Sequence, residues 1–234
     1  MLSHAGIKAG DRLLAVHDHN EAAQVRTVLE RLDAGATVAV VTDAGTPGVS
    51  DPGERLVAAA AAAGHEVTTV PGPSAAVAAL VVSGLDTGRF CFEGFLPRVG
   101  AGRKERIAAV AAERRTTVLY ESPHRVRRTV ADLVAACGPH RRVAVCRELT
   151  KAFEEVWRGS LAAAVTRLDE TAPRGEYVLV LDGAPAPEPP SDDDIAAALA
   201  EATAAGASTR DAASRVATRL GVPKKRVYDL ATRR

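Results

Sequence analysis

The feature that most constrains this chain is the alternation of short apolar runs with helical patterns in its first third. Apolar residues dominate segments 13–16 and 37–42, and a helical pattern over 21–32 separates the two. Continuous apolar strands are typical of parallel sheets, which are covered on both faces. The spacing therefore predicts a strand, a helix and a strand of a parallel α/β sheet.

Further elements extend this first unit. Asp51 and Pro52 are typical of the cap and first position of a helix, which continues through an alanine run to residue 63. A short strand over 66–70 follows, and a turn leads into a helix over about 75–82. We expect an open, doubly wound, mostly parallel sheet.

A second set of α/β elements begins near Phe90. The pattern predicts strands over 116–120, 142–147, 154–157 and 177–181, with helices over 103–112, 123–136 and 160–168. These elements favour a second α/β domain with a mixed sheet.

The end of the chain has a different character. Four prolines between residues 183 and 190 indicate a linker, because proline lacks an amide donor and fixes φ. Three short helices over 192–205, 209–220 and 223–232 resemble a helix-turn-helix arrangement. The predicted organisation is thus two α/β domains (1–88, truncated, and 89–183), a Pro-rich linker (184–191) and a helical basic module (192–234).

Composition places few limits on function. The formal net charge is +1, but residues 208–234 hold eight basic against two acidic residues. The three cysteines form no Cys-x-x-Cys pair, which argues against a disulfide framework and a thiolate zinc site. No run of about eighteen apolar residues and no signal-peptide layout is present. We expect a cytoplasmic protein without a membrane segment.

Two loops that follow predicted strands contain small residues. Segment 43–48 follows the strand over 37–42, and segment 71–75 opens a helix whose first amides can donate to a ligand. In doubly wound sheets the ligand crevice lies outside the carboxyl ends of the strands. Composition alone favours the interpretation of both loops as tight turns in which Asp43 caps a local amide.

Later motifs make the pattern specific. ESPHR at 121–125, RELTK at 147–151 and GEY at 175–177 accompany the two loops, with HDHNE at 17–21 and FCFEGFLP at 90–97. This ordered set resembles the ribosomal RNA small-subunit methyltransferase I family, of the tetrapyrrole-methylase-like class, over nearly all of the chain.

The resemblance implies a cofactor and a substrate. The family transfers a methyl group from S-adenosylmethionine to the ribose 2′-oxygen of a cytidine in 16S ribosomal RNA, in the decoding region of the small ribosomal subunit. It implies a homodimer and no metal. The cofactor-binding residues carried over are Asp43, Ala44, Gly45, Thr46, Pro47, Ser74, Ala75 and Tyr120.

A 2′-hydroxyl is a very weak acid, so some group should accept or polarise its proton. The candidates near the expected cleft are Glu121, His124, Glu148 and Lys151. Each has a structural alternative. Glu121 and Arg125 are four residues apart and could form an ion pair, His124 could cap or pack, and Glu148 could pair with Arg147 or Lys151.

Basic residues indicate where RNA phosphates would bind. They lie near the glycines at 100 and 102, after the strand over 116–120, and in the last helix. An ordinary solvated charged surface is the alternative. The candidates are Arg98, Arg103, Lys104, Arg125, Lys224, Lys225 and Arg226.

Two features stand apart from this pattern. His17 and His19, with Asp18 between them, have the spacing of metal ligands on a strand, but no third ligand cluster accompanies them. Members of the family also begin with an additional strand and a Pro- and Gly-containing turn that help close the cofactor site. Residues 1–7 resemble the middle of the first domain, so we expect a chain that starts late through a misassigned start, a fragment or a real shortening.

Two other functions fit part of the pattern. A tetrapyrrole methylase would share the α/β domains but has no need of the basic helical tail. A non-catalytic RNA- or DNA-binding protein would use a truncated α/β body as a scaffold for that tail. Binding of S-adenosylmethionine distinguishes the last alternative from the enzymes.

Overall fold

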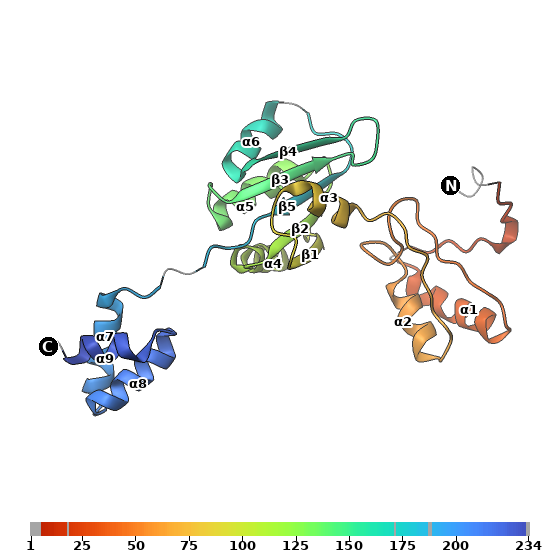
Figure 1. Ribbon diagram of the computed structural model, residues 1–234. Helices are drawn as coiled ribbons and strands as arrows, with labels where there is room; N and C mark the ends of the chain where they lie inside the picture. Colours follow the sequence, from red (N-terminus) through yellow and green to blue (C-terminus); the bar gives the residue numbers. More distant parts are fainter. Residues whose placement is uncertain (1–5, 18, 171, 187–188, 233–234) are drawn as a thin grey trace. The chain divides into compact units, whose positions relative to one another are not determined.

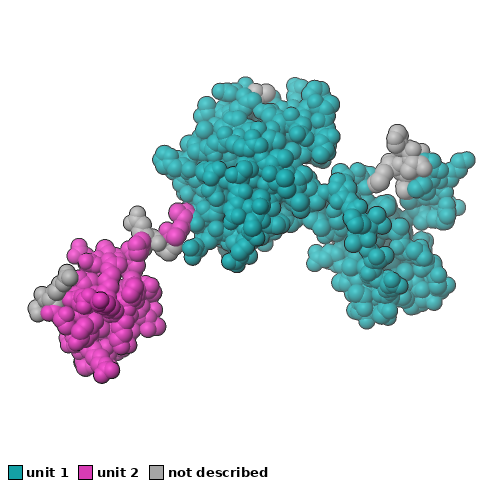
Figure 2. Space-filling model, viewed as in Figure 1, with its two compact units in different colours: residues 1–184 teal, residues 185–234 magenta. Residues whose placement is uncertain are grey.

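The computed structural model describes residues 6–17, 19–170, 172–186 and 189–232. The chain divides into two compact units, residues 1–184 and residues 185–234, coloured teal and magenta in Figure 2. Each unit has a hydrophobic core of its own.

A five-stranded mixed sheet is the centre of the first unit. Its strands lie in the order β1-β2-β5-β3-β4. β1 and β2 are parallel, and the other neighbouring pairs are antiparallel. The mixed sheet predicted for the second half of the chain is confirmed. The strand bounds are β1 Phe90–Phe95, β2 Thr116–Glu121, β3 Arg142–Arg147, β4 Glu155–Ser160 and β5 Tyr177–Leu181.

Helices cover both faces of this sheet (Figure 1). On one face, α4 (Ala101–Ala112), α5 (Val126–Cys137) and α6 (Leu161–Glu170) pack against sheet residues such as Leu119 and Leu179. On the other face, α3 (Ala75–Ser83) packs against Val118, Val180 and their neighbours. Because successive strand residues point to opposite faces, a strand covered on both sides buries consecutive side chains, most of which are apolar. This explains the apolar runs at 118–120 of β2, 143–146 of β3 and 177–181 of β5. The buried carboxylate of Glu121 in β2 has hydrogen-bond partners.

In the described residues before α3, the two predicted helices are present but the predicted strands are not. α1 (Glu21–Asp33) and α2 (Glu54–Ala62) confirm the helical patterns, and a 3₁₀ turn, η1, covers Gly10–Arg12. Segments 13–16, 37–42 and 66–70 are not strands in the described chain. An apolar run indicates that a segment tends to be buried. A strand also requires a neighbouring strand that completes its backbone hydrogen bonds. No described segment supplies that neighbour here, so this part of the prediction was wrong.

The start of α2 also differs from the prediction. Asp51 and Pro52 precede the helix, and Gly53, with φ of 135°, occupies the cap position without a side-chain cap. The buried carboxylate of Glu21 in α1 caps α2 instead: its Oε1 accepts hydrogen bonds from the amides of Gly53 (2.9 Å), Arg55 (2.9 Å) and Leu56 (3.4 Å). A carboxylate there satisfies free amides and complements the helix dipole. Local sequence could not reveal a cap supplied from 32 residues away.

The second unit is a three-helix module, as predicted. Ile195, Val216 and Val227 are buried in its core. Ser191 and Asp194 form a capping box at its first helix, and Gly221 ends the second helix with φ of 63°. Part of the predicted linker, residues 187 and 188, lies outside the described residues. The helices are α7 Asp192–Ala204, α8 Thr209–Leu220 and α9 Lys224–Thr232.

Within the described ranges, no helix combines the length and the apolar character needed to cross a membrane.

Candidate functional site

The loops singled out in the sequence open onto one edge of the sheet. β1, β2 and β3 run in the same direction, so their carboxyl ends meet there. The register places Phe95 beside Tyr120, and Tyr177 between Glu121 and Arg147. The ESPHR, RELTK and GEY motifs therefore border a single edge of the first unit.

On the α3 side of this edge, the two small-residue loops and Tyr120 come together. The hydroxyl of Thr46 donates to the carbonyl of Pro73 at 3.0 Å, which joins the first loop to the second. The amide of Ala76, in the first turn of α3, donates to the Tyr120 hydroxyl oxygen at 3.1 Å. Ser74 caps the same helix by accepting from the Val77 amide at 3.5 Å.

An aromatic cluster surrounds Tyr120. The rings of Phe92 and Phe95 meet its ring edge-on, with centroids 4.9 Å and 5.6 Å away. Strand alternation would place residues three apart on opposite faces, but the register between Phe92 and Gly94 shifts at a β-bulge, so both rings reach the same side. Sequence reasoning missed Phe92 for this reason; Gly94, with φ of 59°, was the available signal.

The environment of Tyr120 keeps its hydroxyl protonated. Burial raises the pKa of Tyr120, the Ala76 amide opposes this, and the charge of Asp51 adds to the increase. The oxygen accepts from Ala76, so the hydroxyl proton is available to a further acceptor.

The surroundings leave room for a ligand next to these groups. Gly45 has φ of 74°, and a Cβ built on it meets nothing within 4 Å. Asp43, Ala44 and Gly45 are exposed. The amide of Ala75, at the start of α3, donates to no described group. The site thus offers a carboxylate, which complements a positive charge, and a free helix amide and a phenol, which can donate to acceptor atoms of a polar small molecule.

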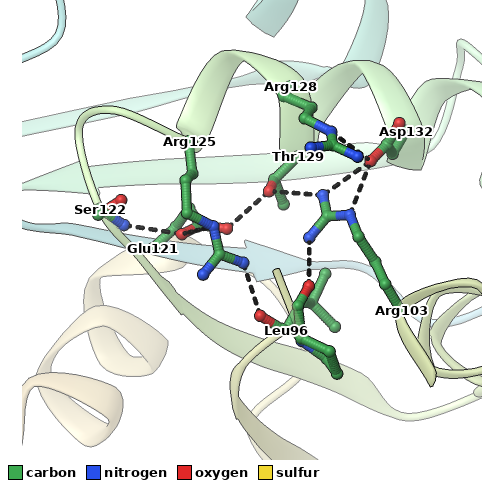
Figure 3. A network of polar contacts seen from close by, with 9 residues as sticks. Leu96, Arg103, Glu121, Ser122, Arg125, Arg128, Thr129 and Asp132 are labelled. Carbon is green, nitrogen blue, oxygen red and sulfur yellow. Dashed lines mark hydrogen bonds and ion pairs between the residues drawn. The ribbon is translucent and has the colours of Figure 1, made fainter. Parts of the chain in front are cut away.

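Glu121 lies on the other face of the sheet, because consecutive strand residues point to opposite sides. Its side chain is fully buried, and both carboxylate oxygens are engaged (Figure 3). Oε1 accepts from the Ser122 amide at 2.9 Å and lies 3.3 Å from Arg125 Nε, while Oε2 accepts from the Thr129 hydroxyl at 2.6 Å. Arg125 also donates to the Leu96 carbonyl at 2.6 Å. This geometry favours the structural interpretation of Glu121 over a role as proton acceptor.

Arg103 extends the same network (Figure 3). Its guanidinium donates to Asp132 at 2.7 and 3.0 Å, to Thr129 at 3.0 Å and to the Pro97 carbonyl at 3.0 Å. Only 4% of Arg103 is exposed, although it was predicted to contact RNA. The structure corrects that assignment, because a buried and fully engaged guanidinium is not available to a phosphate. The sequence spacing on α4 could not reveal its partner on α5.

The loop between β3 and β4 holds the other acid and base candidates. Lys151 Nζ lies 3.0 Å from Glu148 Oε1 and 2.8 Å from Glu176 Oε2, and Glu148 Oε1 also accepts from the Glu176 amide at 2.9 Å. The Glu176 and Glu148 carboxylates raise the pKa of Lys151, so it is a cation at neutral pH. The Glu176 amide and then Lys151 lower the pKa of Glu148. Glu148 Oε2 accepts no hydrogen bond from described groups.

His124, Arg98 and Lys104 lie at the surface. Their side chains form no hydrogen bond or ion pair with any part of the chain that the structure describes. The structure therefore leaves an imidazole and two cations accessible near the loops that follow β1 and β2.

The basic residues of α9 fall into two groups. Lys224 and Lys225 are exposed and form no ion pair with described residues. Arg226 is paired with Asp192 of α7, at 2.6 Å.

The His17 and His19 rings are in edge contact, with centroids 6.1 Å apart, and Asp18 lies outside the described residues. Over the described ranges, no group of three His, Cys, Asp or Glu side chains has the arrangement of a metal site.

The sequence is similar to proteins of one family. Residues 3–165 match the family model of tetrapyrrole (corrin/porphyrin) methylases. A protein from Mycobacterium tuberculosis named ribosomal RNA small subunit methyltransferase I is 46% identical over 230 residues, which are 95% of this chain and 78% of the relative. A protein of the same name from Synechocystis is 41% identical over 220 residues, which are 93% of this chain and 79% of the relative.

Solved structures show a related fold. A cobalt precorrin-4 methyltransferase of cobalamin biosynthesis matches with a TM-score of 0.56 at 18% identity, over 76% of this chain and 77% of that one. Diphthine synthase matches with a TM-score of 0.54 at 17% identity, over 78% and 72%. At these identities the likeness concerns the fold, and it agrees with the predicted tetrapyrrole-methylase-like class.

Proposed function

Because this chain belongs to the tetrapyrrole methylase family and, within it, to the ribosomal RNA small subunit methyltransferase I proteins, we propose that it methylates ribosomal RNA. The reaction transfers a methyl group from S-adenosylmethionine to the ribose 2′-oxygen of a cytidine in the decoding region of 16S ribosomal RNA. The structural observation that carries the proposal is the meeting of the Thr46 loop, the start of α3 and Tyr120 at one sheet edge.

The residues at this edge suit S-adenosylmethionine, which supplies an activated methyl group when bound. The free amide of Ala75 and the hydroxyl of Tyr120 can hold its polar groups, and the Asp43 carboxylate complements its positive charge. The open space at Gly45 admits the ligand beside the backbone. The cofactor-binding set is Asp43, Ala44, Gly45, Thr46, Pro47, Ser74, Ala75 and Tyr120.

Methyl transfer to oxygen is an in-line displacement, so alignment of the two reactants supplies much of the rate, up to roughly 7–11 kcal/mol in favourable cases. Removal of the hydroxyl proton needs a base. Lys151 is protonated, and Glu121 is buried on the other face of the sheet. We assign the proton acceptor to His124, whose imidazole is exposed and unengaged by described residues, and assign Glu148 and Lys151 to fixing the neighbouring loop.

The RNA would contact cations on both units. Arg98, Lys104, Lys224 and Lys225 are exposed and not engaged with described side chains. Arg125 keeps part of its guanidinium accessible beside Glu121, and Arg226 could exchange Asp192 for a phosphate.

Methyl transfer from radiolabelled S-adenosylmethionine to small ribosomal subunits tests the proposal. Label should enter RNA and be recovered as 2′-O-methylcytidine after nuclease digestion. Calorimetry should detect S-adenosylmethionine binding that weakens in Tyr120→Phe. Absence of both label and cofactor binding in the folded protein would overturn the proposal. Label in a porphyrin precursor would show that the substrate is a tetrapyrrole and not RNA.

His124 is tested separately. His124→Asn should lower kcat by about 10²- to 10⁴-fold, the usual contribution of a positioned base, with cofactor affinity unchanged. If His124→Asn keeps its kcat while Glu148→Gln loses it, the role belongs to Glu148.

We also propose a cytoplasmic homodimer. Its support is the apolar outer surface of α3, where Val77 and Val81 are exposed, together with Val70, which is 88% exposed. Such residues are normally covered in soluble proteins when they form a contiguous patch. Analytical ultracentrifugation should give twice the chain mass, and Val81→Glu should shift the protein to monomer; a monomeric wild type excludes the dimer.

A further inference from the structure

The second unit carries an open groove between α7 and α8, with a volume of about 590 Å³. Arg215 and Arg219 of α8 line it one helical turn apart, and Ser214 and Thr218 lie beside them on the same helix. Glu201 and Ala202 of α7 form the opposite side. Two guanidinium groups thus share one concave surface with two hydroxyl groups.

The two arginines differ in their partners. Arg215 is exposed and forms no ion pair with described residues. Arg219 Nη1 and Nη2 both lie 3.1 Å from Glu201 Oε2. The Arg219 side chain is 55% exposed and that of Glu201 is 71% exposed, so water screens this pair and it contributes little to stability. Another anion that binds the guanidinium can therefore take the place of Glu201 at small cost.

The Ser214 hydroxyl adds a donor next to the arginines. Thr218 donates to the Ser214 carbonyl at 3.1 Å, whereas the Ser214 hydroxyl has no described partner. The guanidinium fork of arginine matches the geometry of phosphate oxygens, and hydroxyl and guanidinium donors together are typical of contacts to a nucleic-acid backbone.

We infer that this groove binds the phosphodiester backbone of RNA, with Arg215 and Arg219 as phosphate ligands and Glu201 as the group that the phosphate displaces. The inference rests on the proposed function for its choice of RNA. The groove is a site in addition to Lys224 and Lys225. Within it, Arg215 and Arg219 should increase the affinity for RNA, and Glu201 should decrease it.

The test is fluorescence anisotropy of a short fluorescein-labelled single-stranded RNA with the full chain over a range of salt concentrations. Arg215→Gln and Arg219→Gln should each weaken binding and reduce the slope of log K against log salt by about 0.7, the value for one single-strand phosphate contact. Glu201→Gln should tighten binding, because it frees Arg219 and removes a negative charge. Arg31→Gln, an exposed arginine of α1 in the other unit, removes the same charge and should leave the slope unchanged.

Circular dichroism establishes that each variant is folded; Arg215, which forms no described ion pair, is the variant least able to affect folding. Wild-type slopes in both Arg215→Gln and Arg219→Gln would overturn the groove, as would weaker binding in Glu201→Gln. Methyl transfer by the wild type is measured in parallel. If the variants change RNA affinity as predicted but the wild type transfers no methyl group, the proposed reaction is contradicted and the assignment of the groove as an RNA site is supported.

Discussion

Tyr120 and Glu121 are adjacent in β2, and strand geometry sends their side chains to different chemical environments. Tyr120 contacts the first turn of α3 on one face of the sheet. Glu121 enters a closed network with Arg125 and Thr129 on the other face. At the scale of single residues, this alternation separates a group that can serve a ligand from one that stabilises the fold.

The first prediction concerns Glu121. Glu121→Gln should lower the free energy of unfolding by about 1–3 kcal/mol, because an amide cannot replace a carboxylate that accepts from a hydroxyl and faces a guanidinium. Urea denaturation measures the change. Glu105→Gln, at an exposed position of α4, is the control and should change stability by less than about 0.5 kcal/mol. Unchanged stability with loss of methyl transfer would instead identify Glu121 as catalytic.

The second prediction concerns Gly175, which has φ of 75° and whose Cβ, if present, would lie 2.5 Å from Glu148 Cδ. Gly138 has φ of 85°, but nothing lies within 4 Å of its Cβ position. Gly138 has ψ of 154°, a backbone conformation that is essentially restricted to glycine, so Gly138→Ala should cost about 1–3 kcal/mol from the backbone alone. Gly175→Ala should cost about 1–3 kcal/mol more, because the methyl group overlaps Glu148. Thermal and urea denaturation of both variants gives the difference, and equal losses would show that Glu148 moves aside freely.

At the scale of elements, the prediction was correct where an element depends on residues close in sequence and failed where it depends on distant ones. Helices depend on contacts within a few residues, so α1, α5 and the three helices of the second unit were predicted to within a few residues at each end. The buried strands β2, β3 and β5 were recognised because each contains at least three consecutive apolar residues. The strands expected near residues 40 and 68 were wrong, because strand pairing depends on a distant neighbour that local sequence does not specify.

The same distinction applies to the site. Sequence identified the loops around Thr46 and Ser74 and the end of β2, and the structure brings them together. It could not show that Arg103 points into a network with Asp132, nor that a bulge turns Phe92 toward Tyr120. Both depend on the direction of a side chain relative to a partner far away in the chain.

The third prediction concerns the loop from β3 to β4. The folded pKa of Glu148 lies below its ordinary 4.5, so its stabilisation is present above pH 4.5 and is lost as the pH falls through the folded value. The folded pKa of Lys151 lies above 10.5, so its contribution is present below pH 10.5 and is lost as the pH rises through the folded value. The contacts of Glu148 and Lys151 should therefore stabilise the folded conformation of this loop between about pH 4.5 and 10.5.

A carboxyl NMR titration of Glu148 checks the acid side. The midpoint should lie below 4.5 in the wild type and rise in Lys151→Gln while staying below 4.5, because the Glu176 amide is the larger cause. A wild-type midpoint at or above 4.5 would contradict the contacts of this loop.

At the scale of the whole molecule, the two units have separate cores and separate charge patterns. The first unit contains the sheet, α3 and the expected cofactor residues. The second unit is a small helical core whose surface carries Lys224, Lys225 and the groove arginines. This division implies that binding of the cofactor and part of the binding of RNA can be separated by cutting the chain between the units.

The final prediction uses that cut. The backbone leaves the sheet by a tight contact: the Ala184 amide donates to the Glu113 carbonyl at 2.6 Å, and Gly183 packs so closely against Arg114 that a Cβ would meet its carbonyl oxygen at 2.0 Å. A chain ending after Ala184 keeps this contact. It should bind S-adenosylmethionine as the full chain does, because the expected cofactor residues lie in the first unit.

Its affinity for RNA should fall, and the salt dependence of binding should become less steep, because the phosphate contacts of the second unit are lost. Calorimetry and anisotropy measure the two quantities on the same preparation. The matched comparison is the full chain carrying Lys224→Gln and Lys225→Gln, which should reproduce part of the loss of RNA affinity without any change in length. If the shortened chain binds RNA with the affinity and salt dependence of the full chain, the basic helices do not contact RNA, and the cations around Arg98 must account for the binding alone.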